Sequence, residues 1–199
     1  MKTQLFLSMA TFALVASITP GPVNIVSLAS SIRYGFRATM LHVTGATFGF
    51  TGLLLLIGLG MYEVLERHPM LMGYLRWFGA AFLVYMALQL AKDSGALTPS
   101  TNQKAPSFWQ GAMMQWLNPK AWLASAAGMG AYAANGNVSL VWQFSFIYFV
   151  ICYVSLAVWA YAGSRLRVYL QNPRYLRLFN HLMAGLLLAS AWYLLVSHE

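Results

Sequence analysis

Two short polar motifs interrupt long apolar segments of this chain, and both contain residues that can bind a small charged solute. Proline fits the first position of a helix, where its missing N–H is not needed. Thr19 and Asn118 each precede a proline, and both are side-chain types that cap helix N-termini. Each motif therefore predicts that one half-helix ends and a second half-helix begins. The two motifs are Thr19-Pro20-Gly21-Pro22-Val23-Asn24 and Asn118-Pro119-Lys120.

The chemistry that these motifs offer is the binding of a carboxylate. The N-terminus of a half-helix has unpaired N–H groups and the positive end of a dipole, which favour an anion. Lys120 adds a full positive charge, which is costly in lipid and should therefore face a cavity. The amine of a substrate would meet Asn24 or the carbonyls that the breaks leave unpaired. The predicted substrate-binding residues are Thr19, Pro20, Gly21, Pro22, Asn24, Asn118, Pro119 and Lys120.

The segments that must position these motifs have the length and composition of membrane helices. Of the 199 residues, 59% are hydrophobic and only 8% are charged, so the chain cannot cover a water-exposed surface. A bilayer core of about 30 Å needs about 20 helical residues. The apolar runs lack the two-residue alternation of barrel strands. We therefore predict an all-α integral membrane protein of one domain, 1–199, with six transmembrane helices at 4–31, 39–62, 71–91, 108–133, 139–163 and 176–197.

The positions of the breaks predict an inverted repeat. Each break lies in the first helix of a group of three helices, and an odd number of helices gives the two groups opposite orientations. Repeat one is 1–91, the loop is 92–107 and repeat two is 108–199. Broken helices in inverted repeats are typical of transporters, in which they form a site near the middle of the membrane. We expect transport by alternating access.

The loop charges predict the orientation. Basic residues concentrate in the loops after the first, third and fifth predicted helices, and such loops stay cytoplasmic. Both termini should therefore lie in the periplasm, with the protein in the inner membrane. The start of the chain, with Lys2 and small residues near Ala16, resembles a cleavable signal peptide. However, the apolar stretch resumes at 23–32, so we interpret it as the first membrane helix.

Several function classes fit the sequence poorly. The net charge of +8 does not form the basic face that nucleic acid requires. Cys152 is the single cysteine, which excludes a disulfide framework and a CxxC redox motif. No HExxH, GxSxG or intramembrane acid pair indicates an enzyme. We predict no catalytic residue, cofactor or metal site. Two alternatives remain: an exporter or uptake carrier of another small carboxylate-bearing metabolite, and a membrane-embedded enzyme.

Five further residues have structural interpretations. His42 and His181 are expected at the membrane interface, near the cytoplasmic ends of their helices. Gly45 and Gly49, with Gly52, fit small-residue contacts between membrane helices.

The two motifs, together with Tyr34-Gly35-Phe36-Arg37, resemble the LysE/RhtB family of amino-acid exporters. The likeness covers nearly the whole chain in length, number of helices and order of motifs. It implies an exporter of amino acids or close derivatives, with positions 20–24 and 118–120 lining the path. It further implies a homodimer and coupling to the proton gradient.

The chain departs from many members of that family in one respect. They carry an acidic residue in the second or fifth helix, whereas this chain has none before Glu63 in the second helix and none in the fifth. This departure disfavours a cationic substrate and leaves the proton-carrying residue unassigned. The sequence therefore predicts export of a small neutral amino acid or amino-acid derivative.

Overall fold

The computed structural model describes residues 2–61, 69–92, 106–133, 137–170 and 172–196. These ranges contain helices and no strand, which confirms the all-α prediction for the described part of the chain. The elements are α1 (Lys2–Ile18), α2 (Pro22–Tyr34), α3 (Phe36–Leu56), the short turn η1 (Ile57–Met61), α5 (Pro69–Ala91), α6 (Phe108–Trp116), α7 (Pro119–Tyr132), α8 (Val138–Tyr169) and α9 (Pro173–Val196).

The helix starts follow local sequence signals. Four of the helices begin at a proline, namely α2, α5, α7 and α9, as expected for a residue that needs no N–H partner. Helix α6 begins after a capping box: Gln110 N donates to Ser107 Oγ, and Ser107 N donates to Gln110 Oε1. The Asn137 side chain caps α8 by accepting from the next helical N–H groups. These polar caps therefore set the first residues of α6 and α8.

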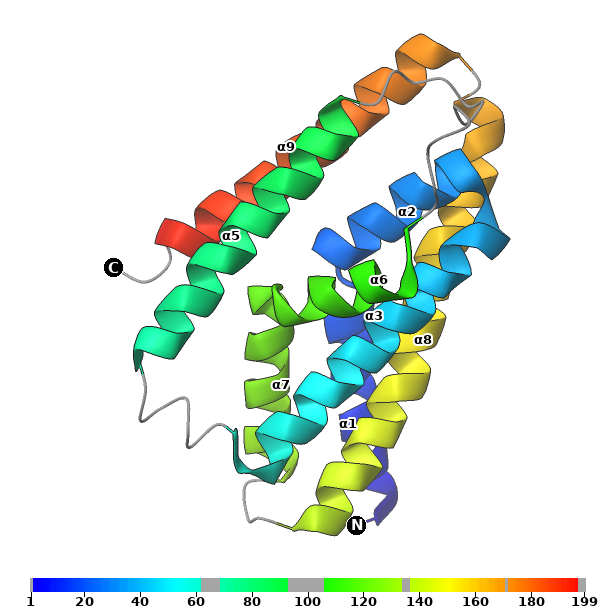
Figure 1. Cartoon of the computed structure of the whole chain (residues 1–199). Coiled ribbons are helices and arrows are strands. Elements are labelled where there is room, and N and C mark those ends of the chain that lie inside the picture. The colour runs from blue at the N-terminus through cyan, green and yellow to red at the C-terminus, as the bar shows by residue number, and fades with distance from the viewer. Residues whose placement is uncertain (1, 62–68, 93–105, 134–136, 171, 197–199) are drawn as a thin grey trace.

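The helices form two groups that meet at α2 (Figure 1). In the larger group, α3 packs along α6 and α8, and α8 also packs along α1 and α2. In the smaller group, α5 and α9 lie side by side along their length. Leu28 and Ile32 of α2 pack against Leu176 of α9 and join the two groups. The first break therefore lies in the larger group, on the helix that also contacts the smaller one.

Glycines allow the closest helix contacts. A Cβ at Gly45 would overlap the Phe108 carbonyl, and one at Gly49 would lie 2.6 Å from the Ala112 carbonyl oxygen. Helices α3 and α6 therefore touch backbone to backbone, which confirms the predicted helix contact at these two positions. Gly52 has nothing within 4 Å of a Cβ, so the same prediction is wrong there, because no described part of a neighbouring helix comes close to this turn of α3.

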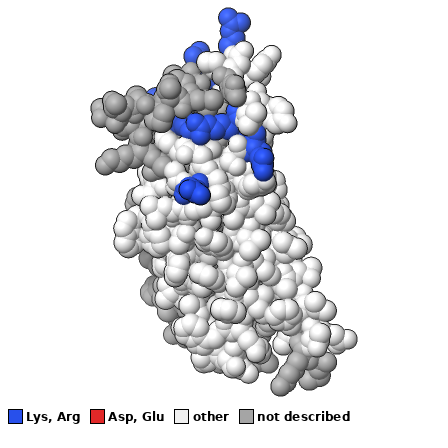
Figure 2. Space-filling model, turned by 90° about the vertical axis from the view of Figure 1, so that its right-hand side faces the viewer, with Lys and Arg blue, Asp and Glu red and all other residues white. Residues whose placement is uncertain are grey.

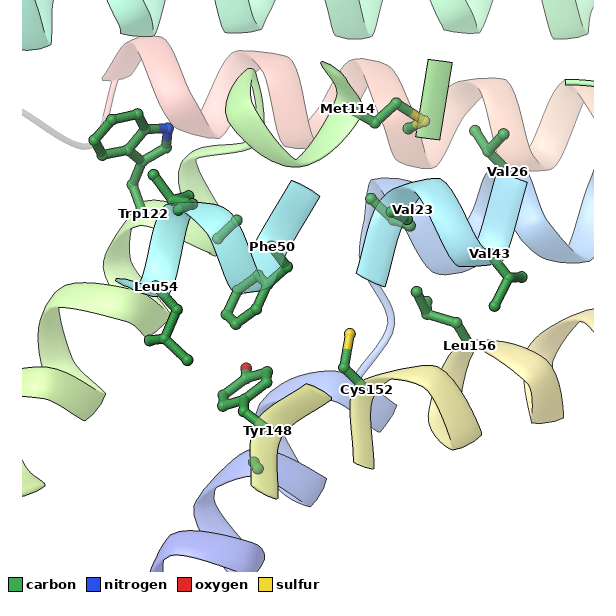
Figure 3. Packing of buried hydrophobic residues seen from close by; sticks show 14 of the residues in the cluster. Val23, Val26, Val43, Phe50, Leu54, Met114, Trp122, Tyr148, Cys152 and Leu156 are labelled. Atoms are coloured by element: carbon green, nitrogen blue, oxygen red, sulfur yellow. The ribbon is translucent and has the colours of Figure 1, made fainter. Parts of the chain in front are cut away.

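Aromatic side chains join α3 and α8 within the apolar core. Phe50 stacks on Tyr148 with ring centroids 4.3 Å apart (Figure 3). Phe144 meets Tyr148 edge to face. Outside this core, large apolar side chains remain exposed, such as Trp77 at 62% and Phe146 at 70%. A surface of this kind suits lipid tails rather than water.

The predicted spans are confirmed only in part. By length and composition, Phe36–Gly60 and Val138–Tyr169 can each cross a membrane, and α1 with α2 forms a third span if the pair is counted as one. The predicted segment 108–133 is two short helices, because the second motif ends α6 and starts α7. The segment predicted at 139–163 continues to Tyr169, since polar residues extend the helix beyond its apolar part. The arrangement of six spans as two inverted repeats stays a prediction.

The charged residues have an uneven distribution (Figure 2). Lysines and arginines gather toward one end of the molecule on the face shown, and the described residues include no Asp or Glu. This end contains the last turn of α2 with Arg33 and the last turn of α8 with Arg167. The basic residues of different loops therefore meet at one end, as the loop pattern predicts.

The two histidines differ. His181 is exposed, with Nδ1 2.7 Å from the Arg177 carbonyl oxygen. His42 is completely buried in α3. The prediction of an interfacial position is therefore wrong for His42, because α6 covers this face of α3 and a Cβ at Gly111 would overlap the His42 carbonyl.

Candidate substrate-binding site

The first break separates α1 from α2 with a bend of 58°. The N-cap of α2 is Gly21, in an extended conformation, and no side chain caps this N-terminus. Thr19 instead turns back and donates its hydroxyl to the Val15 carbonyl. The predicted Thr19 cap is therefore wrong: the second proline, Pro22, takes the first helical position, so the helix starts too far from Thr19.

The carbonyl groups at the end of α1 are satisfied by side chains. A helix end leaves carbonyls without partners inside the helix, and in an apolar environment each needs another donor. Here four successive carbonyl oxygens accept from three side chains of α2, α7 and α8. The donor and acceptor pairs are Asn24 Nδ2 to Ser17 O (2.9 Å), Trp159 Nε1 to Ile18 O (3.0 Å), Lys120 Nζ to Thr19 O (2.6 Å) and Lys120 Nζ to Pro20 O (3.4 Å).

The second break is closed by its own residues. Asn118 is the N-cap of α7 and its Oδ1 accepts from the backbone N–H of Lys120 at 3.1 Å, which confirms the predicted Asn118 cap. Pro119 begins α7. Trp122 Nε1 donates to the Trp116 carbonyl at 2.7 Å, across the break from α7 to the end of α6. Both sides of this break are therefore satisfied locally.

The structure brings the two motifs together through Lys120. Its ammonium group reaches across to the α1 end, about one hundred residues away in the sequence. Gly21 lies directly beside it: a Cβ at this position would lie 3.2 Å from Lys120 Cδ and 3.3 Å from Nζ. Gly21 therefore leaves the space that the lysine side chain occupies.

A small pocket of about 30 Å³ lies at this junction, with room for about one water molecule. Three of the eight predicted substrate-binding residues, Asn24, Asn118 and Lys120, line it. Sequence reasoning missed other lining residues. Ser17 and Gln115 are polar residues in apolar runs, which is a signal that could have found them. Phe50 and Tyr148 give no such signal. The additional lining side chains include Ser17 and Gln115. They also include Phe50 of α3 and Tyr148, Cys152 and Leu156 of α8, which Figure 3 labels.

The pocket has an unbalanced charge. Lys120 is half-buried, and no described residue is acidic, so carbonyl dipoles alone face the ammonium group. The Ser17 hydroxyl is buried without a partner among the described residues. The site can therefore bind a carboxylate at Lys120 and at the uncapped N–H groups of α2. It can bind an ammonium group at the carbonyls that Lys120 now holds.

Interrupted helices that meet at a polar pocket in an apolar helical protein are typical of membrane transporters. The family model for the LysE type translocator matches residues 14–198. The chain therefore belongs to the LysE type translocator family, which confirms the resemblance seen in its motifs.

Curated relatives extend this result over most of the chain. A cysteine/O-acetylserine efflux protein of Klebsiella pneumoniae is 28% identical over 195 residues, which is 96% of this chain and 97% of the relative. Proteins with the same name from Salmonella typhimurium and Escherichia coli O6:K15:H31 are 27% and 29% identical, over 77% and 66% of this chain and 79% and 67% of their own lengths. No solved structure matches.

Proposed function

We propose that this protein exports a small neutral amino acid or amino-acid derivative across the bacterial inner membrane by alternating access. The family and the names of the relatives support export, and cysteine and O-acetylserine are both small zwitterions at neutral pH. The observation that carries the proposal is the contact of Lys120 with Thr19 O at 2.6 Å. This contact joins a cation to carbonyl oxygens that accept from a side chain and not from the helix, and the two groups complement the two ends of a zwitterion.

The substrate enters the site by exchange with Lys120. A substrate ammonium group has the same charge and the same three donors as the Lys120 ammonium group. It can therefore replace Lys120 at the carbonyls of Thr19 and Pro20. Lys120 then pairs with the substrate carboxylate, together with the uncapped N–H groups of α2. A zwitterion satisfies both steps without leaving an unpaired charge in the membrane.

The cycle requires the junction to open, because a pocket of about 30 Å³ is too small for an amino acid. In the proposed cycle, rocking of the two repeats opens the junction first to the cytoplasm and then to the periplasm. The basic end faces the cytoplasm. Reporter fusions at Gly95 and Asn172 should therefore be cytoplasmic, and fusions at Gly136 and the C-terminus periplasmic. The reverse pattern would contradict this orientation.

The family resemblance supports a homodimer and proton coupling, and both are part of the proposal. Purified protein in liposomes should release a loaded amino acid faster when an inward proton gradient is imposed. An unchanged rate would refute proton coupling. Cross-linking in native membranes should give a band of twice the chain mass, and its absence would argue against the dimer.

Export is tested in cells that are loaded with a dipeptide and overproduce the protein. They should release the amino acid faster than cells without it. Lys120→Met should abolish this gain while the protein still inserts, because the substrate carboxylate loses its charge partner. Lys92→Met removes an exposed lysine at the end of α5 and is the matched control. Wild-type efflux by Lys120→Met would contradict the proposed site, and a resistance screen with toxic amino-acid analogues identifies the substrate.

A further inference from the structure

A second cavity lies between α2, α3, α6 and the pair α5 and α9. Its volume is about 340 Å³, more than ten times that of the pocket at the breaks, and the two share no lining residue. This volume is at the lower end of the range of about 300–1,000 Å³ for small-molecule sites. The cavity can therefore hold a small organic solute in the conformation in which the junction at the breaks is closed.

The polar groups that line this cavity favour an anion. They include Arg33, His42, Gln110 and Asn180, and no acidic residue is among the described residues of the wall. His42 and Asn180 are almost completely buried. Neither ring nitrogen of His42 has a hydrogen-bond partner among the described residues. A buried polar group without a partner is costly, so a polar ligand atom would relieve this cost.

The cavity lies on the way from the basic end to the breaks. Helix α2 lines both spaces, with Asn24 at the breaks and Arg33 in its last turn at the cavity. Nine residues of helix separate these two positions by about 13 Å. Helix α6 repeats this pattern, with Gln115 at the breaks and Gln110 at the cavity. The two spaces are thus successive along the same pair of helices.

We propose that this cavity is a second binding site, which holds a small carboxylate-bearing solute before it reaches the breaks. Arg33 would bind the carboxylate, since a guanidinium group can donate two parallel hydrogen bonds to it. His42 and the amides of Gln110 and Asn180 would donate to its remaining lone pairs. The identity of the solute as an amino acid rests on the proposed function, but the site itself does not.

The test is equilibrium binding of radiolabelled L-cysteine, kept reduced, to the purified full chain in lipid nanodiscs. Lys120→Met disables the site at the breaks and should still bind about one molecule per chain. Adding Arg33→Gln should weaken this remaining binding by about tenfold or more, as expected for the loss of a charged hydrogen bond. Arg37→Gln is the matched control, because Arg37 is an exposed arginine nearby that does not line the cavity.

A competition experiment tests carboxylate binding in the second cavity without a substitution in that cavity. In Lys120→Met, 3-mercaptopropionate, which lacks the amine, should displace cysteine. Cysteamine, which lacks the carboxylate, should not. The proposal is overturned if Lys120→Met binds no cysteine, if Arg33→Gln weakens binding no more than Arg37→Gln, or if cysteamine competes equally well. Normal export by Lys120→Met would instead contradict the site at the breaks and leave the binding result for the cavity intact.

Discussion

Both breaks end one half-helix and begin another, but different kinds of contact satisfy their backbone groups. The second break is closed locally: Asn118 caps α7, and Trp122 binds the end of α6. The first break is closed mainly from a distance, by Lys120 of α7 and Trp159 of α8, with local bonds from Asn24 and Thr19. A break that closes itself can act as a fixed support. A break that depends on other helices would open if those helices moved, as the proposed cycle requires.

The N-termini of α2 and α7 also differ in whether a side chain of the same break caps them. The Asn118 side chain occupies the first free N–H of α7, whereas no side chain caps α2. The N–H groups available to a substrate carboxylate therefore belong to α2. From the sequence we expected both N-termini to bind the substrate carboxylate. In the proposed site, the N-terminus of α2 and the Lys120 side chain bind it.

The largest expected effect comes from removing the first break. Replacing Pro20, Gly21 and Pro22 together with alanine should restore helical hydrogen bonds, since proline costs about 3 kcal/mol and glycine about 1 kcal/mol relative to alanine. The carbonyls and N–H groups that face the site would then pair with each other, so transport should be lost while the melting temperature is kept or raised. Efflux and melting are measured on the same variant.

The matching change at the second break sharpens this test. Pro119→Ala should keep most of the transport, because Asn118 still caps α7. A stable triple-alanine variant that exports at a near-normal rate would mean that the first break is not the binding site.

The next effect concerns the contact between the breaks. Gly21→Ala places a Cβ about 3.2 Å from Lys120 Cδ, so the lysine must shift. The backbone at Gly21 is extended and accepts any residue, which leaves this contact as the cause. We expect efflux to fall by roughly tenfold, for a loss of about 1.4 kcal/mol. Gly52→Ala meets nothing within 4 Å and should behave as wild type. Equal efflux by both variants would show that the packing of Lys120 is unimportant.

A smaller effect is expected at the Asn118 cap. Asn118→Ala should lower stability by about 1 kcal/mol, and Asn118→Ser should restore most of it, because serine is also a good N-cap. The measurement is the midpoint of thermal unfolding in one detergent. If serine and alanine destabilise equally, the second break is not held by its cap.

The smallest expected effects on stability and efflux come from replacing the tryptophan at each break. Trp159→Phe and Trp122→Phe each remove one hydrogen bond to a carbonyl, at a cost of about 1 kcal/mol. Both should shift melting slightly, but Trp159→Phe alone should also slow efflux, because it acts at the first break. Slower efflux by Trp122→Phe, with normal efflux by Trp159→Phe, would contradict this difference between the two breaks.

The sequence predicts the features that depend on local chemistry. Proline at a helix start, the Asn118 cap and the two interruptions need only a few neighbouring residues, and all three are found. The family follows from the same motifs. Local chemistry also predicted a Thr19 cap, which is wrong. Either Pro20 or Pro22 could begin the helix, and α2 begins at Pro22.

The features that depend on packing could not be predicted in this way. The burial of His42 follows from the contact between α3 and α6, which one sequence does not reveal. The hydrogen bond from Trp159 Nε1 to the Ile18 carbonyl depends on the packing of α8 against α1. Phe50 and Tyr148 reach the site only because α3 packs on α8.

The order of synthesis gives the closure of the first break a further meaning. Helix α1 leaves the ribosome first, but Lys120 and Trp159, which satisfy three of the four carbonyls at its end, follow 100 or more residues later. Until they arrive, those carbonyls need water or lipid headgroups as partners, since the hydrocarbon core offers none. We therefore expect the first segment to reach its final depth in the membrane only after the second half of the chain is inserted, so that the helix made first would be the last to be completed.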